Sequence, residues 1–175
     1  MDFSEFLPFL AARASVRTYD REPVTAQDLE YLIECASTAP SAGNREAWDV
    51  VAVTDPAKKD ALSRAALRQR QVADAPLVLV VCAHHPRSAS RYGDRGRLYA
   101  VQDATIACTY LMLAAHARGL QTCWVGAFQE EEVRSVLDIP GEVRPVALLT
   151  VGRGSVPPSR TGRIPPADHL HRKHW

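Results

Sequence analysis

The stretch from about Leu98 to Arg118 limits what this chain can fold into more than any other part of the sequence. Its pattern predicts the longest helix of the chain, with apolar residues nearly all the way around. Such a helix has to be buried. Gln102, Asp103 and Thr109 interrupt the apolar run, and a membrane span needs roughly 20 predominantly apolar residues, so we expect no span. The fold must cover this helix with the rest of the chain or with a second subunit.

Helices and strands alternate along the remainder of the sequence. Thr25 is a predicted N-cap with Asp28 three residues later, and this helix ends at Pro40. A further helix is predicted over residues 56–72, and a short acidic one begins at Glu130. Strands are predicted over residues 48–53, 77–81, 122–125 and 143–151. The uninterrupted apolar run at 77–81 is typical of a central strand buried on both faces.

Two segments near these elements are harder to assign. Pro8 is expected to break or delay the first helix, because proline lacks the amide that a helix interior uses. Residues 84–97 are charged and contain Gly93 and Gly96, which predicts a mobile loop.

Composition and charge point to one compact domain without an electrostatic nucleic-acid or membrane surface. The chain has 175 residues, is 46% hydrophobic, and carries 21 basic and 20 acidic residues, for a net charge of +1. The first five residues carry acids where a secretory signal has bases, so we expect the cytoplasm. The four cysteines are widely spaced and form no Cys-x-x-Cys pair, which argues against disulfides and zinc.

The composition changes after Gly152. Regular helix or inner strand is excluded by four prolines, Pro157, Pro158, Pro165 and Pro166. Ile164, Leu170 and Trp175 are apolar residues that a disordered tail would not need. His169, His171 and His174 could hold a metal by spacing alone, but such a cluster without a cysteine or acidic partner is more often solvated surface.

Two short motifs carry groups suited to a ligand. Arg13-Ala14-Ser15-Val16-Arg17 places two guanidiniums four residues apart, on one face if the segment is helical, and suits a phosphate. The stretch from Pro40 to Trp48 contains Ser41, Gly43 and Asn44, which suit the polar edge of a flat heterocycle. Each motif also has an ordinary explanation, as a solvent-facing arginine pair or a surface turn.

Other nucleotide and hydrolase motifs are excluded. Gly152-Arg153-Gly154 imitates the start of a dinucleotide fingerprint, but Pro157 prevents the helix that must follow. The sequence has no P-loop and no Gly-x-Ser-x-Gly elbow.

Taken together, these motifs resemble the nitroreductase-like superfamily of FMN-dependent oxidoreductases. The family opens with Arg-x-Ser-x-Arg before an aromatic residue, here Tyr19, and continues with a Pro-Ser-x-x-Asn-x-Gln-Pro-Trp loop. Further matches are the helix from Tyr99, the Cys123–Phe128 turn and the closing Thr161–Pro165 segment. Glu46 and Ala47 replace the usual Gln-Pro. An ionised carboxylate cannot donate a hydrogen bond, so a contact from the family's glutamine to the flavin is in doubt.

The resemblance implies an α+β fold: a mostly antiparallel central sheet flanked by helices, with residues 1–152 forming the FMN-binding domain. Residues 153–175 would form an extended arm of the same domain that crosses to the partner subunit of a homodimer, with FMN at the interface. The implied FMN-binding residues are Arg13, Ala14, Ser15, Arg17, Pro40, Ser41, Ala42, Asn44, Glu46, Trp124, Val125, Gly126 and Arg163.

Within that set, the resemblance implies different roles. Arg13, Ser15 and Arg163 would hold the phosphate and ribityl end, and Arg17 would lie near the pyrimidine edge of the ring, where its charge stabilises the reduced anion. Residues 40–44, from the partner subunit, would hold the other polar edge. Backbone amides of 124–126 would approach the reactive ring nitrogen, with Gly126 allowing close contact.

The implied activity is a ping-pong transfer of two electrons from NAD(P)H through FMN to a nitroaromatic or quinone. No catalytic side chain and no metal are expected, because the redox chemistry belongs to the cofactor. Alternatives are a specialised superfamily member, either flavin-consuming or a reductive dehalogenase, and a non-catalytic flavin-binding protein. A plain domain of helices and strands without cofactor is the weakest alternative.

Overall fold

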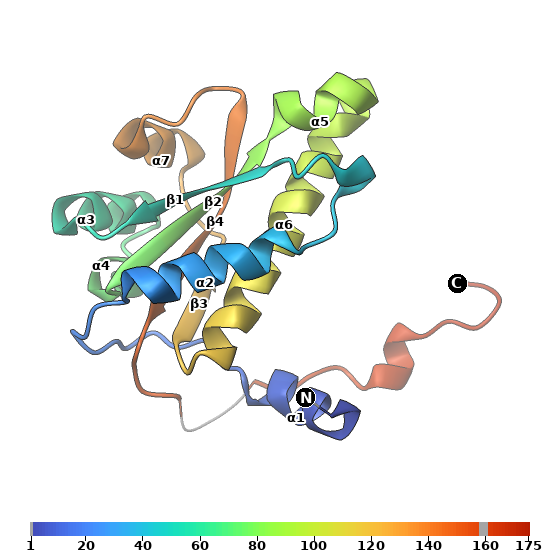
Figure 1. Ribbon diagram of the computed structural model, residues 1–175, viewed down its shortest axis with the longest axis horizontal. Coiled ribbons are helices and arrows are strands. Elements are labelled where there is room, and N and C mark those ends of the chain that lie inside the picture. Colours follow the sequence, from blue (N-terminus) through green and yellow to red (C-terminus); the bar gives the residue numbers. More distant parts are fainter. Residues whose placement is uncertain (1, 158–160) are drawn as a thin grey trace.

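A four-stranded antiparallel sheet lies between two layers of helices (Figure 1). The computed structural model describes residues 2–157 and 161–175. Its strands are β1 (Trp48–Val53), β2 (Leu77–His84), β3 (Gln121–Val125) and β4 (Val143–Gly152). Their order in the sheet is β1-β2-β4-β3, and every neighbouring pair is antiparallel. The α+β class and the antiparallel sheet are therefore confirmed.

The helices divide between the two faces of the sheet. Helices α2 (Ala26–Ser37) and α6 (Gly96–Ala117) pack on one face, and α3 (Pro56–Ala65), α4 (Arg70–Asp74) and α7 (Glu130–Leu137) pack on the other. The remaining helical segments are α1 (Phe3–Ala12), α5 (His85–Tyr92), η1 (Ala42–Asn44), η2 (Gly93–Arg95) and η3 (Pro166–His169).

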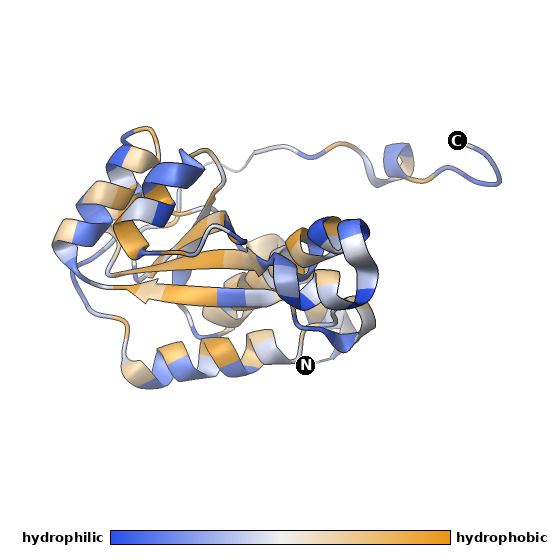
Figure 2. Ribbon diagram, turned by 90° about the horizontal axis from the view of Figure 1, so that it is seen from above, coloured by the Kyte–Doolittle hydropathy of each residue, from blue (hydrophilic) through white to orange (hydrophobic). Residues whose placement is uncertain are grey.

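Strand β2 is central and buried on both faces, as its apolar run predicts. Leu77, Leu79 and Val81 belong to the core cluster that contains α2 and α6, whereas Val78 and Val80 belong to the cluster on the opposite face. Because side chains alternate along a strand, a strand between two helical layers needs apolar residues at every position. Figure 2 shows this apolar sheet between the helices.

Helix α6 buries one face against the sheet through small side chains. Ala100, Ala104, Ala107 and Cys108 are fully buried, which lets the helix axis approach the strands closely. Leu98 is 51% exposed, and several apolar residues of the opposite face are only partly covered. By length and composition the run from His85 to Ala117 could cross a membrane, but in this fold α6 packs as a core helix against α2 and the sheet.

The start of α2 confirms the predicted cap. The Thr25 hydroxyl accepts a hydrogen bond from the Asp28 amide at 3.0 Å and donates to the Asp28 carboxylate at 2.8 Å. These bonds satisfy an amide that the first helical turn otherwise leaves without a partner.

The single helix predicted over residues 56–72 is wrong, because the chain breaks it into α3 and α4. Leu67 and Arg68 both have left-handed backbone conformations, with φ of 57° and 60°. The Ser63 hydroxyl donates to the Gln69 carbonyl at 3.0 Å and stabilises the turn. The break allows Leu62 on α3 and Val72 on α4 to enter the same core cluster.

The mobile loop predicted over residues 84–97 is also wrong, because α5 and η2 occupy it. Ser88 is fully buried, and the backbone of Gly96 packs so closely on Ala89 that an added Cβ would lie 2.6 Å from its backbone atoms. Glycine therefore serves close packing here, where the sequence pattern suggests flexibility.

Pro8 does not break the first helix, since α1 runs through it. Proline removes the hydrogen bond to the carbonyl of Ser4. Both residues are exposed, so water can satisfy that carbonyl.

The C-terminal segment leaves the body of the molecule (Figure 1). Residues 161–175 are all exposed and contain no regular element except η3, as its prolines predict. Pro158 lies outside the described residues. The crossing of this arm to a partner subunit stays a prediction.

Candidate functional site

The first arginine motif is extended, so the helical condition under which its two guanidiniums would share one face is not met. Helix α1 ends at Ala12, and the Val16 amide then donates to the Thr122 carbonyl at 2.9 Å, beside the edge strand β3. Side chains alternate along an extended segment, so Arg13, Ser15 and Arg17 still share one side while Val16 is buried on the other. The two guanidiniums thus lie on one side of the chain, as the motif predicts, but because side chains of an extended segment alternate every two residues and not because of a helical turn.

These three residues meet the C-terminal arm at a cavity of about 510 Å³, which we call the arginine cavity. Its lining comprises Leu10, Ala11, Arg13, Ala14, Ser15, Arg17, Pro157, Thr161 and Arg163. Three guanidiniums and two hydroxyls thus converge, and no carboxylate is among these described lining residues. A cavity with this balance of charge suits an anion.

A partly buried tyrosine, Tyr19, holds the motif in place. The Tyr19 hydroxyl lies 2.6 Å from the Thr150 hydroxyl and donates to the Val16 carbonyl at 2.9 Å. Burial raises the pKa of Tyr19 well above its usual value, so the phenol stays protonated and able to donate. The contact between the Tyr19 and Thr150 hydroxyls links the arginine segment to β4.

The chain leaving β4 lies against the same segment. The Asp20 amide donates to the Arg153 carbonyl at 2.9 Å, and Tyr19 pairs with Gly154 in an isolated bridge. A Cβ added at Gly154 would lie 2.1 Å from the Thr18 carbonyl oxygen. Only glycine permits this approach, which directs the arm that carries Arg163 toward the arginine cavity.

The positive charges of the arginine cavity also affect a residue of the neighbouring strand β3. Burial raises the pKa of the Cys123 thiol, while the positive charges of Arg17 and Arg13 lower it. Both guanidiniums therefore act electrostatically on β3 directly beneath the motif.

The second motif forms a tight loop near the start of α6. Gly43, Asn44 and Glu46 have φ values of 55°, 56° and 47°, all in the left-handed region. The Ser41 hydroxyl accepts from the Glu46 amide at 2.9 Å and closes the turn.

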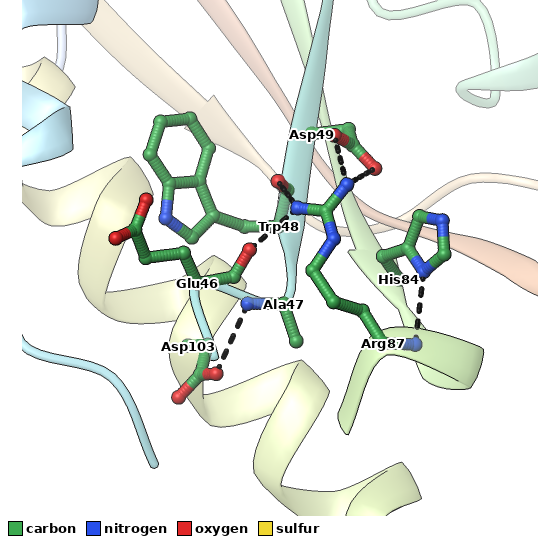
Figure 3. A network of polar contacts seen from close by, with 7 residues as sticks. All are labelled: Glu46, Ala47, Trp48, Asp49, His84, Arg87 and Asp103. Atoms are coloured by element: carbon green, nitrogen blue, oxygen red, sulfur yellow. Dashed lines mark hydrogen bonds and ion pairs between the residues drawn. The ribbon is translucent and has the colours of Figure 1, made fainter. Parts of the chain in front are cut away.

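A buried carboxylate from α6 supports this loop at both ends, and Figure 3 shows its contact with Ala47. Asp103 is 2% exposed and accepts from the Ala42 amide at 2.8 Å and from the Ala47 amide at 3.2 Å. Hydrogen bonds from two amides offset the loss of hydration of this buried charge.

An arginine of helix α5 forms hydrogen bonds with the end of the loop. The Arg87 guanidinium donates to the carbonyls of Glu46 at 2.6 Å and Trp48 at 3.1 Å, and pairs with Asp49 at 3.0 Å. His84 caps α5, since its Nδ1 accepts from the Arg87 amide at 3.1 Å.

The start of the loop lines a second cavity of about 470 Å³, which we call the loop cavity. Its lining comprises Pro40, Ser41, Ala42, Tyr99, Val101, Gln102, Asp103, Thr105 and Ile106. Asn44 and Glu46 belong to the loop but do not line the cavity, and both are exposed.

The remaining predicted residues lie on β3 and just after it. Trp124, Val125 and Gly126 line neither cavity. A Cβ added at Gly126 would meet the Trp124 indole at an ordinary 3.5 Å, so the described chain gives no steric reason for glycine there.

Sequence reasoning missed the residues that position the site. The sequence pattern marks Asp103 as an interruption of an apolar helix, and a lone carboxylate on such a helix signals a buried polar partner. Arg87 gave no signal, because its partners on β1 are about forty residues away in the sequence.

Comparison with known proteins identifies the family of the chain. The family model for the nitroreductase family matches residues 10–74 and 63–153. The chain belongs to the nitroreductase family. It is an oxidoreductase of that family.

Individual relatives span most of the chain. An NADH dehydrogenase of Thermus thermophilus is 33% identical over 168 residues, covering 80% of this chain and 82% of its own. An FMN reductase [NAD(P)H] of Bacillus subtilis is 28% identical over 176 residues, covering 93% of this chain and 71% of its own. The solved structure of NfrA2 from B. megaterium has a TM-score of 0.91 at 30% identity, covering all of this chain and 76% of NfrA2.

Proposed function

We propose that this nitroreductase binds FMN and uses it to pass two electrons from NAD(P)H to an electron-poor small molecule, of nitroaromatic or quinone type, in a ping-pong cycle. The observation that carries the proposal is the arginine cavity, in which Arg13, Arg17 and Arg163 converge from opposite ends of the chain. A relative at 28% identity is named FMN reductase, which supports the choice of ligand.

The residues present fit FMN. Arginine matches the geometry of phosphate oxygens, and hydroxyls can accept or donate at a ribityl chain. Arg13, Ser15 and Arg163 would hold the phosphate end, with Thr161 beside them. Arg17 would face the pyrimidine edge. The cavity of about 510 Å³ is also within the size range of ordinary ligand sites.

When bound, FMN would supply the two-electron redox chemistry. The chain's own task is to orient the ring and set its electrostatics. Tyr19 and Thr150 hold the arginine segment on β4, and the guanidiniums, which have no carboxylate among the described residues that line the cavity, favour an anion. We expect no side chain to act as an acid or base.

The site is best completed by a second subunit. Within one chain the arginine cavity is lined by the end of α1, the segment after it and the C-terminal arm, whereas the loop cavity is lined by residues 99–106 near the start of α6. A homodimer in which the arginine cavity of one subunit faces the loop cavity of its partner would unite the two groups of predicted residues. Trp124, Val125 and Gly126 would then offer backbone amides to the ring.

The first test is whether the protein holds FMN. The purified protein should be yellow and should bleach with NADPH or NADH without oxygen. Parallel double-reciprocal plots with a quinone would support the ping-pong order, and intersecting plots would contradict it. Colourless protein that ignores added FMN would end the proposal.

The second test concerns the phosphate site. Arg163→Ala should weaken FMN affinity by about tenfold to a hundredfold, because charge-assisted hydrogen bonds contribute on the order of 1.5–3 kcal/mol. Arg172→Ala is the matched control, since Arg172 lies exposed on the same arm and does not line the cavity. Equal FMN affinity in both variants would remove Arg163 from the site.

A further inference from the structure

Four arginines near the loop cavity have no acidic partner among the described residues. Arg45 lies on the loop, and Arg91, Arg95 and Arg97 lie on α5, η2 and the start of α6. In the described part of the chain none of the four forms an ion pair, although Asp94 lies within the same run. Figure 1 shows α5 above the first turns of α6, beside the loop.

Two of these arginines form a row with two tyrosines. The Arg91 guanidinium lies 5.6 Å from the centre of the Tyr92 ring, and that of Arg95 lies 5.5 Å from the centre of the Tyr99 ring. The two rings meet edge to face at 4.9 Å. Arg95 also donates to the Tyr99 hydroxyl at 2.6 Å. We call Arg91, Tyr92, Arg95 and Tyr99 the Arg-Tyr row.

The row extends from the loop to the cavity. Tyr99 lines the loop cavity. At the other end, Arg91 donates to the Gly43 carbonyl at 3.5 Å, and a Cβ added at Gly43 would lie 2.2 Å from the Tyr92 hydroxyl. Glycine at position 43 therefore allows the loop to pack directly against the Arg-Tyr row.

The chemistry of the row suits a nucleotide that ends in a phosphate. Tyrosine and arginine planes can stack on a base, and guanidiniums bind phosphate with paired hydrogen bonds. A phosphate monoester carries about −1.5 to −2 charges at pH 7 and three acceptor oxygens. Such a terminal group offers enough oxygens for contacts with two guanidiniums, whereas each phosphate of a dinucleotide bridge offers only two free oxygens.

We propose that the Arg-Tyr row binds the adenosine 2′-phosphate of NADPH, so that the protein prefers NADPH to NADH. This inference deepens the proposed function and rests on it. An anionic electron acceptor is the other source of a negative group that could reach the row, and the experiment separates the two.

The binding test uses nucleotide fragments and needs no turnover. Calorimetry would compare adenosine 2′,5′-bisphosphate with adenosine 5′-monophosphate on the FMN-loaded protein. We expect the bisphosphate to bind at least about tenfold more tightly, as one charge-assisted contact would give. The doubly substituted Arg91→Ala/Arg95→Ala protein should lose this difference.

The kinetic test uses the ratio of kcat/KM for NADPH to that for NADH. This ratio should fall about tenfold or more in the double variant. Arg64→Ala is the control, because Arg64 is exposed on α3 at the opposite end of the sheet, and it should leave the ratio unchanged. Lysine at positions 91 and 95 should restore part of the preference, since it keeps the charge but loses the paired geometry.

Two results would overturn the inference: equal affinity of the wild-type protein for both adenosine nucleotides, or an unchanged kinetic ratio in the double variant. A changed KM for an anionic acceptor with an unchanged ratio would assign the row to the acceptor instead. Discrimination between the fragments by a protein without turnover would retain the nucleotide site and reject the proposed function. Turnover by a protein that does not discriminate between the two nucleotide fragments would retain the proposed function and reject the nucleotide site.

Discussion

At the scale of single residues, Asp103 decides the shape of the loop. Its carboxylate is almost fully buried and accepts from the amides at the two ends of the segment from Ala42 to Ala47. An apolar helix gains nothing from burying a charge unless the charge satisfies donors that would otherwise be lost. Burying the Asp103 carboxylate is therefore unfavourable for α6 by itself, but its hydrogen bonds fix the conformation of the loop.

Asp103→Asn tests this role. An amide keeps one acceptor oxygen but turns an NH₂ group toward the second backbone amide, which leaves a buried donor unsatisfied. We expect a loss of about 1–3 kcal/mol in the free energy of unfolding, measured by urea denaturation. Asp60→Asn, at an exposed position of α3, is the control. Equal midpoints and slopes for the two variants would show that Asp103 contributes nothing to the loop.

At the scale of elements, an ion pair joins the start of α2 to the end of α6. Arg118 donates to Asp28 at 2.7 Å from Nη2 and at 3.0 Å from Nε, and its guanidinium lies over the Tyr31 ring. The Arg118 contact, followed by the Thr25 hydroxyl, lowers the pKa of the Asp28 carboxyl. The two helices that cover one face of the sheet are thus linked at one end.

This link predicts an acid dependence of stability. A carboxyl with a lowered pKa in the folded state stabilises it above the unfolded pKa of about 3.9, and the gain disappears as pH falls through the folded value. Asp28→Asn should cost about 1 kcal/mol near neutral pH, since Arg118 is partly exposed. The difference from wild type should shrink as pH falls through the lowered folded-state pKa of Asp28 and vanish below it. Denaturation at several pH values checks this, and a difference independent of pH would contradict it.

At the scale of the whole molecule, exposed apolar side chains gather at the two ends of the chain. Phe6 and Leu7 on α1, and Ile164, Leu170 and Trp175 on the arm, are each at least half exposed. Together with the partly covered face of α6 they provide apolar surface for a second subunit. The arm also contributes Arg163 to the arginine cavity, so assembly and ligand binding are expected to depend on each other.

Ile164→Ser combined with Leu170→Ser should weaken the homodimer. Burying each of these side chains contributes about 1.5–3 kcal/mol, so we expect the dimer dissociation constant to rise at least about a hundredfold. Analytical ultracentrifugation measures it, with Leu67→Ser, an exposed leucine on the turn after α3, as the control. A dimer of unchanged stability, or a wild-type monomer, would show that the arm does not hold a partner.

The sequence by itself determined features that depend on near neighbours. The Thr25 cap, the bounds of β1 and the two-sided burial of β2 follow from local hydrogen bonding and from side-chain alternation. The polar residues of both motifs could likewise be picked out in advance as candidate ligand contacts, because their types suit polar ligands, and their binding of FMN stays a prediction.

Only the tertiary structure decided features that depend on distant partners. Residues 84–97 form helices because Arg87 reaches carbonyls near residue 47 and Gly96 packs on α5. The first arginine motif is extended because its amide pairs with Thr122. Arg163 meets Arg13 because Gly154 lets the chain leaving β4 pass close to Thr18. Each of these outcomes rests on a bond or contact between residues far apart in the sequence, and local propensity carries no information about such contacts.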